Sequence, residues 1–233
     1  MLVGLNAQGK SAVLEALYLL ATSKSHRTSR DMDMIRLGDP FSRVLAEVKR
    51  LARNDLTIEI DLSRSEKKVL KINGVKHPRI GDAVGQLNAA VFSDSDIDMV
   101  RGEPARRRRF LNLEISQIRP QYVYALGRYK RALDQRNNLL REIKAGNAST
   151  GGLEVWDRQL AAYGSTVIAR RAEFVRFLET ASANIYATLT DGAEQFAVSY
   201  KANVDPGEGS GESEIAERFL RALAEKRDLD LSR

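Results

Sequence analysis

Hydrophobic residues alternate with polar ones in two stretches of the first third of the chain. These stretches are 44–48 and 56–62, and the second holds four aliphatic residues at every other position. A period of two is typical of β-strands that bury one face. The apolar run 69–72 is followed by Asn73-Gly74, a dipeptide favoured in the tight turn of a hairpin. The pattern therefore predicts a group of antiparallel strands.

Helix-forming residues dominate the second half of the chain. Residues 119–144 and 153–189 contain almost no helix breakers, and the glycine-rich segment 146–152 separates them. Two long helices joined by a short loop are typical of an antiparallel pair. The sequence thus predicts a helical arm.

The last forty or so residues change character again. Residues 195–200 have the composition of a strand, 205–211 that of a flexible linker, and 212–226 the spacing of an amphipathic helix. We therefore expect the chain to leave the arm through a strand and to end in a helix.

A glycine-rich loop near the start of the chain carries the most specific chemistry. Residues 4–11 read GLNAQGKS, which satisfies the pattern GxxxxGK[ST]. We predict a strand end at Leu2-Val3 before this loop and a helix over 12–22 after it, the order that a phosphate-binding loop requires. A glycine turn that precedes a helix by chance is the alternative reading. The residues assigned to nucleotide binding are Gly4, Leu5, Asn6, Ala7, Gln8, Gly9, Lys10 and Ser11.

The spacing of this loop follows from the chemistry of phosphate. The glycines permit the positive φ angles that turn main-chain N–H groups inward, and the unpaired amides of the following helix point at the same anion. Lys10 would reach the β- and γ-phosphates, and the Ser11 hydroxyl would take one position on Mg²⁺. The expected cofactors are therefore ATP and Mg²⁺.

Composition excludes several other kinds of site. The chain has no cysteine and two histidines, which rules out disulfides and argues against a zinc site of the usual Cys/His type. No apolar stretch is long enough for a membrane helix, so we expect no membrane partner.

Positive charge is concentrated in one segment. Twelve basic and four acidic residues lie in 101–144, a net charge of +8, whereas the whole chain carries +6. Such asymmetry suits an acidic polymer such as DNA, although solvated helices carry similar charge. The densest run is Arg106, Arg107, Arg108 and Arg109, the candidate DNA contacts. A helix turns by about 100° per residue, so these four cannot all face one partner.

Residues for hydrolysis are harder to find. Phosphoryl transfer needs an acidic residue at the end of a buried strand. The nearest case is the apolar run 89–92 within an expected short strand 88–93, but Ser93 intervenes before Asp94, and Asp94 more simply starts a helix. We therefore expect no turnover above background from this chain alone.

Four segments match a known family. They read LVGLNAQGKSAVLEALYLLATSKSHRT (2–28), AVFSDSDIDMVRGEPARRRRFLN (90–112), YKRALDQRNNLL (129–140) and LEVWDRQL (153–160). Together they resemble the RecF family of bacterial DNA replication and repair proteins. The resemblance covers nearly the whole chain and is far more specific than the phosphate loop alone.

The resemblance implies an α/β fold of the P-loop NTPase type. It implies an ABC-type head lobe with antiparallel β-strands, and a helical second lobe with a long antiparallel helix pair. The corresponding domains are 1–103 as the nucleotide-binding lobe, 104–192 as the helical arm and 193–233 as a return segment to the first lobe. His26 and Arg27 would lie near the nucleotide, within reach of the base or ribose.

The implied function is ATP-dependent DNA binding in the repair of replication gaps and in recombination, with a link to the SOS response. ATP would join two heads into a dimer on DNA in the cytoplasm, and the partners RecO and RecR would help to load recombinase. Slow hydrolysis would release the DNA.

The chain departs from the family pattern at several places. Family members have further strands before the loop, and a later segment with the signature helix and the Walker B acids, none of which we find here; the first lobe is expected to be incomplete at its N-terminus and the return segment truncated. Leu5, Ser11, Asp94 and Asn112 also differ from the usual residues. Residues 149–153 look like a signature motif, but their place between two long helices indicates a hairpin loop.

Two other functions fit parts of the sequence. One is a small-molecule P-loop kinase or transferase, which would need an acceptor pocket and a lid. The other is a chain that binds no nucleotide and serves only as an interaction surface. An ATP analogue with Mg²⁺ separates the three readings. It would alter dimerisation and DNA affinity in a RecF-type protein, phosphorylate an acceptor in a kinase or transferase, and change nothing in a chain that binds no nucleotide.

Overall fold

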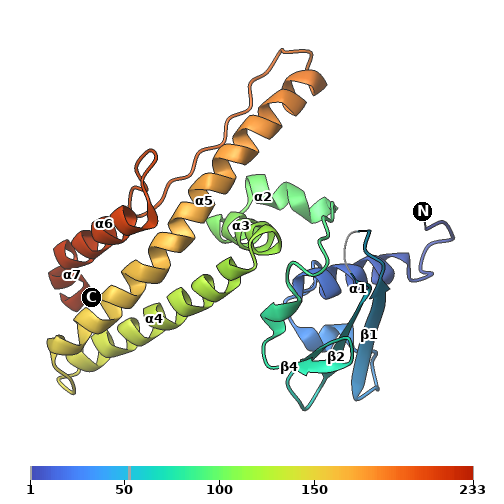
Figure 1. Cartoon of the computed structure of the whole chain (residues 1–233), viewed down its shortest axis with the longest axis horizontal. Helices are drawn as coiled ribbons and strands as arrows, with labels where there is room; N and C mark the ends of the chain where they lie inside the picture. Colours follow the sequence, from blue (N-terminus) through green and yellow to red (C-terminus); the bar gives the residue numbers. More distant parts are fainter. Residues whose placement is uncertain (1, 52–53, 233) are drawn as a thin grey trace. The chain divides into compact units, whose positions relative to one another are not determined.

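The computed structural model describes residues 2–51 and 54–232. The chain folds as two compact units, Met1–Pro120 and Gln121–Arg233 (Figure 1). This places one boundary after Pro120, and the three-part division at residues 103 and 192 stays a prediction.

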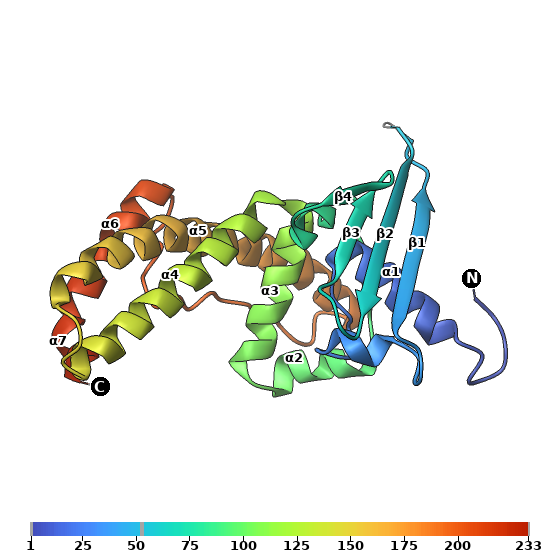
Figure 2. The same ribbon diagram turned by 90° about the horizontal axis from the view of Figure 1, so that it is seen from below.

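The first unit is built on a four-stranded antiparallel sheet (Figure 2). Its strands are β1 (Phe41–Val48), β2 (Leu56–Ser63), β3 (Val69–Ile72) and β4 (Val75–His77), paired in chain order. Every second residue of β2 is buried, which is the predicted period. Asn73 and Gly74 adopt positive φ angles of 51° and 76° in the β3–β4 turn, as a two-residue hairpin requires. The predicted antiparallel strands are confirmed.

One helix closes the core of this unit. Helix α1 (Lys10–Thr22) places Leu19 and Leu20 among the buried side chains of β2 and β3. The short helices η1 (Asp31–Met34) and η2 (Ile80–Ala83) flank this core. The chain then runs through η3 (Asp94–Asp96), α2 (Ile97–Arg101) and α3 (Pro104–Ile118).

The second unit is helical. Helices α4 (Gln121–Lys144) and α5 (Leu153–Leu189) lie side by side as the predicted antiparallel pair, joined through η4 (Thr150–Gly152) (Figures 1 and 2). Helix α6 (Glu212–Glu225) packs on α5, and α7 (Arg227–Ser232) follows it. Trp156 lies half-buried on α5, one turn before the buried Leu160. None of the described helices combines the length and apolarity needed to cross a membrane.

A group of four charges joins three helices of the second unit. Arg136 of α4 donates from Nε to Oδ1 of Asp157 on α5 at 2.6 Å and from Nη1 to Oδ2 of Asp230 on α7 at 2.8 Å. Arg227 donates to the other oxygen of Asp157 at 3.0 Å. Arg136 and Asp157 are buried, so each charge depends on the others for compensation.

Three predicted strands are wrong. Residues 2–3, 88–93 and 195–200 have no regular secondary structure. A strand needs a neighbour to pair its N–H and C=O groups, and none of these segments joins the sheet of the described chain. The N–H of Ala89 instead donates to the side chain of Gln117 at 2.8 Å. Helix boundaries shift slightly: α1 begins at Lys10, α4 begins at Gln121 and α6 ends at Glu225.

Candidate functional site

The glycine-rich loop forms an open turn in front of α1. Residues 2–9 are exposed, and Ala7 and Gly9 have positive φ angles of 64° and 82°. Gly9 precedes the first turn of α1, which receives no hydrogen bond from a capping side chain and contains no acidic residue. The first amides of a helix that lacks such a cap are available to an anion. The structure thus places the eight predicted residues at the start of α1, and their binding of a nucleotide stays a prediction.

Lys10 folds back over this loop. Its Nζ donates to the carbonyl oxygens of Gly4 and Leu5, each at 2.7 Å. A side chain added at Gly4 or Gly9 would meet nothing within 4 Å, so the space around the loop is open. The ammonium group therefore stands at the loop, with Ser11 exposed beside it at the start of the helix.

The segment after α1 is tied to the same helix. Glu15 accepts a short hydrogen bond from the Ser25 hydroxyl and an ion pair from Arg27 at 3.2 Å. The Ser25 hydroxyl also accepts the N–H groups of Arg27 and Thr28 at 2.9 and 3.1 Å. Arg27 keeps 57% of its side chain exposed, so one partner holds it while much of its surface faces solvent.

His26 stands edge-on to an aromatic ring of α1. Its ring centroid lies 5.4 Å from that of Tyr18, with 85° between the planes. The Nδ1 atom of His26 is buried and has no hydrogen-bond partner among the described residues. The expected contact of His26 and Arg27 with a nucleotide stays a prediction.

The four arginines of α3 have different roles. Arg106 pairs with Asp98 at 3.1 Å, and Arg107 donates to the carbonyls of Met99 and Gly102 at the end of α2 at 3.1 and 2.9 Å. Arg109 donates to the carbonyl oxygen of Ser25 at 3.0 Å. In the part of the chain that the structure describes, Arg108 has no such partner. Three of the four predicted DNA contacts therefore have partners within the first unit, and DNA contact by Arg106–Arg109 stays a prediction.

Burial changes the acidity of two groups near α1 and α3. It raises the pKa of the Glu114 carboxyl on α3 above its ordinary value. Burial also raises the pKa of the Tyr18 hydroxyl, and the negative charge of Glu114 adds to that shift. Burial thus disfavours the charged form of each group.

The described residues contain no group of three His, Cys, Asp or Glu side chains that could hold a metal ion. Ser11 offers a single hydroxyl oxygen, and the nearby carboxylate of Glu15 is engaged by Ser25 and Arg27. With one hydroxyl oxygen from the protein, the site fits Mg²⁺ when phosphate oxygens and water supply the other ligands.

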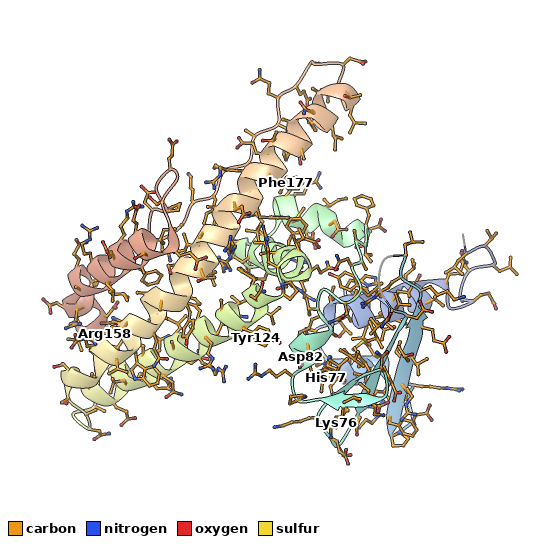
Figure 3. The ribbon with its side chains drawn as sticks, in the orientation of Figure 1. Lys76, His77, Asp82, Tyr124, Arg158 and Phe177 are labelled. Carbon is orange, nitrogen blue, oxygen red and sulfur yellow. The ribbon has the colours of Figure 1, made fainter. Side chains whose placement is uncertain are left out.

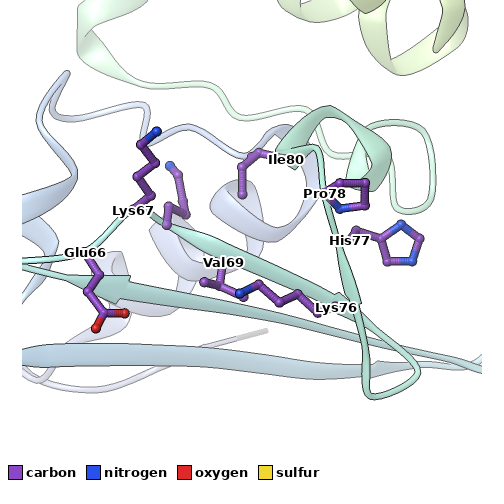
Figure 4. Close-up of a pocket in the computed structure, with 8 residues that line it drawn as sticks. Glu66, Lys67, Val69, Lys76, His77, Pro78 and Ile80 are labelled. Carbon is purple, nitrogen blue, oxygen red and sulfur yellow. The ribbon is translucent and has the colours of Figure 1, made fainter.

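Sequence reasoning missed a hollow on the sheet (Figure 4). It has a volume of about 470 Å³, with Val69 and Ile80 as apolar lining and Lys67, Lys76 and His77 at its rim. His77 (Figure 3) faces Asp82, with 3.3 Å between Nδ1 and Oδ2. The adjacent residues Lys67 and Lys68 were a sequence signal for this hollow. Lys68, however, forms an ion pair with Asp31, with 2.8 Å between Nζ and Oδ2.

Comparison with known proteins decides the family. No family model matches the chain. The DNA replication and repair protein RecF of Acetivibrio thermocellus is 38% identical over 233 residues, which is all of this chain and 63% of that protein. RecF of Bacillus cytotoxicus is 33% identical, again over the whole chain and 62% of its own length. The chain belongs to the RecF family.

Solved RecF structures agree with this assignment. Two of them, described as the recombination mediator protein RecF-ATPrS and RecF-ATP in the RecFOR pathway, superpose with TM-scores of 0.89 and 0.91 at 30% identity. Each match covers 98% of this chain and 61% of the solved one. The expected fold, an ABC ATPase head with an antiparallel sheet and a helical lobe with a long helix pair, is confirmed. The chain spans about three fifths of the length of these RecF relatives.

Proposed function

We propose that this RecF chain binds ATP at Gly4–Ser11 and that nucleotide binding controls its hold on DNA during the repair of replication gaps and recombination. Two ATP-bound copies would close on DNA, in the cytoplasm, and act with RecO and RecR to help load recombinase. The name and pathway of the solved RecF relatives support this proposal.

The phosphate loop carries the proposal. Uncapped helix amides, positive φ angles at Ala7 and Gly9, open space around the glycines and the Lys10 ammonium together form an anion site. The relative described as RecF-ATP matches this chain over nearly its whole length. A triphosphate would draw the Lys10 ammonium from the carbonyls of Gly4 and Leu5, because phosphate offers a charged acceptor in their place.

Mg²⁺ would be held by the Ser11 hydroxyl together with phosphate oxygens and water. A bound Mg²⁺ supplies charge neutralisation for the β- and γ-phosphates. The protein's own contribution is to place a neutral hydroxyl in the first turn of α1, where no carboxylate repels the phosphates.

Calorimetric titration with ATP and Mg²⁺ tests the proposal. Lys10→Ala removes a charge-assisted contact of about 1.5–3 kcal/mol, so we expect the affinity to fall by about tenfold or more. Lys24→Ala is the matched control, since Lys24 is an exposed lysine just beyond the other end of α1. Undiminished binding by the Lys10 variant, or no binding by the parent chain, contradicts the proposal.

The same titrations separate binding from turnover. We expect ATP with Mg²⁺ to increase self-association and DNA affinity in the parent chain and not in the Lys10 variant. We expect no phosphate release above background from this chain alone. Release that disappears in Lys10→Ala would show that expectation to be wrong.

A further inference from the structure

Two glycines lie in the interiors of long helices, and packing explains only one. A Cβ on Gly164 of α5 would stand 2.6 Å from Cε2 of Phe219 on α6, so the packing of these helices requires glycine there. A Cβ on Gly127 of α4 would meet nothing within 4 Å. Glycine weakens a helix interior relative to alanine. Packing against the described residues therefore does not account for Gly127.

Cations surround Gly127 on the side of α4 that faces away from the core. Tyr124 lies three residues before it, and Lys130 and Arg131 lie three and four residues after it, the positions that are neighbours on a helix surface. Arg128 is adjacent in sequence. All four side chains are exposed, and within residues 2–51 and 54–232 Arg128, Lys130 and Arg131 have no hydrogen-bond or ion-pair partner.

The exposed side of α4 suits a polyanion better than a protein surface. All residues of α4 are described, and Tyr124 (Figure 3) is its one exposed aromatic or aliphatic side chain. Protein interfaces need an apolar centre, which this surface lacks. Its exposed charges are five cations and two carboxylates, namely Arg128, Lys130, Arg131, Arg141, Lys144, Asp134 and Glu142.

The exposed cations form two groups along the helix, one at 128–131 and one at 141–144. From Arg128 to Lys144 there are sixteen residue steps, or about 24 Å of helix at 1.5 Å per residue. A single phosphate ion would use only a small part of that length, whereas a strand of nucleic acid presents a row of phosphates. Glycine is the residue that admits the close approach of a ligand to a backbone.

We propose that the outer face of α4 centred on Gly127 seats a sugar–phosphate backbone of DNA. Gly127 lets the strand approach the helix, and Lys130 and Arg131, which flank it on the same face, contact its phosphates. The proposal rests on the proposed function only in taking the polyanion to be DNA. It assigns the contacts to free cations of the arm, whereas three of the four arginines at 106–109 already bind groups of the first unit.

Gly127→Ala gives the first test, because the two expected effects have opposite signs. Alanine favours the helix and should raise the melting temperature by about 2 °C. The added methyl group should hold the strand away and weaken binding of a gapped duplex by about tenfold in a filter-binding assay. Gly127→Gln should weaken it further. DNA affinity equal to that of the parent in both variants overturns the proposal.

The salt dependence of DNA binding gives the second test. Each of Lys130→Ala and Arg131→Ala should reduce the slope of log affinity against log salt by about 1. Arg158→Ala is the control, since Arg158 (Figure 3) is an exposed cation of α5 paired with Glu154. An unchanged slope in the two α4 variants overturns the proposal. The proposal is also overturned if the α4 variants lose binding to polyglutamate while their DNA binding stays intact, because that result would indicate an acidic protein as the partner.

The two proposals fail in different ways. If Lys10→Ala abolishes the response to ATP while the Gly127 and cation variants bind DNA normally, the proposed function stands and the α4 surface does not. If the α4 variants lose DNA affinity but ATP has no effect on the parent, the surface stands and nucleotide control does not. A parent chain that binds no DNA overturns both.

Discussion

At the residue scale, the main electrostatic feature is a group of buried charges in the second unit. Arg136 and Asp157 are buried and compensated by Arg227 and Asp230. The Nη2 atom of Arg136 and Nε of Arg227 are buried with no partner among the described residues, so the cluster is not fully satisfied. Removing one member of such a cluster leaves charges that water cannot reach.

Asp157→Ala should therefore destabilise the protein strongly. Loss of one partner of a buried ion pair costs about 3–5 kcal/mol, and urea denaturation should show a free energy of unfolding lower by that amount. Glu154→Ala removes an exposed carboxylate paired with Arg158 one turn earlier on α5. That control should change stability by no more than about 0.5 kcal/mol. Equal effects of the two substitutions would contradict the assignment of a buried cluster.

Glu114 provides a test by pH. Its pKa in the folded protein is raised by burial, so between the unfolded and folded pKa values the native state keeps a proton that the unfolded state has lost. The free energy of unfolding contributed by this group therefore decreases as pH rises through that window. We expect Glu114→Gln to be more stable than the parent at pH 7, and the difference to vanish below about pH 4, where both forms are neutral. Urea denaturation across pH measures it, and a stability gain that persists at low pH would be inconsistent with this cause.

At the element scale, the sequence predicted what depends on local pattern. The alternation at 56–62 became β2, Asn73-Gly74 became the hairpin turn, and the long helices began and ended within a few residues of their predicted bounds. The failures at 2–3, 88–93 and 195–200 concern strands, because a strand exists only when a second segment pairs with it. Apolar composition alone does not reveal whether that segment is present.

The candidate site divides in the same way. GLNAQGKS predicted the loop because the motif and its geometry occupy the same eight residues. The run Arg106–Arg109 predicted positive charge but not the partners of these side chains. The partners are the Asp98 carboxylate and main-chain carbonyls at the end of α2 and at Ser25, and a sequence does not show which carbonyl a side chain will reach. Gly127 had no sequence signal, since its meaning depends on what a Cβ would touch.

Gly164 marks the closest approach of two helices. Gly164→Ala should lower the free energy of unfolding by about 1–3 kcal/mol, because the new methyl group overlaps the ring of Phe219. The double variant Gly164→Ala with Phe219→Leu should recover part of that loss in urea denaturation. No recovery would indicate that the glycine is needed for another reason. Gly164→Ala should thus lower the stability, whereas Gly127→Ala should raise it.

At the scale of the whole molecule, each unit has a hydrophobic core among its described residues. One is formed by α1 with β2 and β3 in the first unit, and another by α5, α6 and the segment before α6 in the second, where Ile168, Val204 and Ile215 are buried. A compact unit with its own core is expected to fold independently.

Residues 121–232 expressed alone should therefore fold. We expect helical circular dichroism with a cooperative thermal transition, since α4, α5, α6 and α7 contact one another within this unit. The same segment carrying Asp157→Ala should melt at a lower temperature. A gradual, non-cooperative loss of helix in the parent segment would contradict the prediction.

The position of Trp156 has a practical consequence. It is the single tryptophan of the chain, and it lies half-buried on α5 beside the ion cluster. Its indole emission therefore reports on the second unit, whereas the tyrosines, such as Tyr18 and Tyr122, are shared between the two. Unlabelled protein thus carries an optical probe that follows one half of the molecule while the phosphate loop in the other half is titrated.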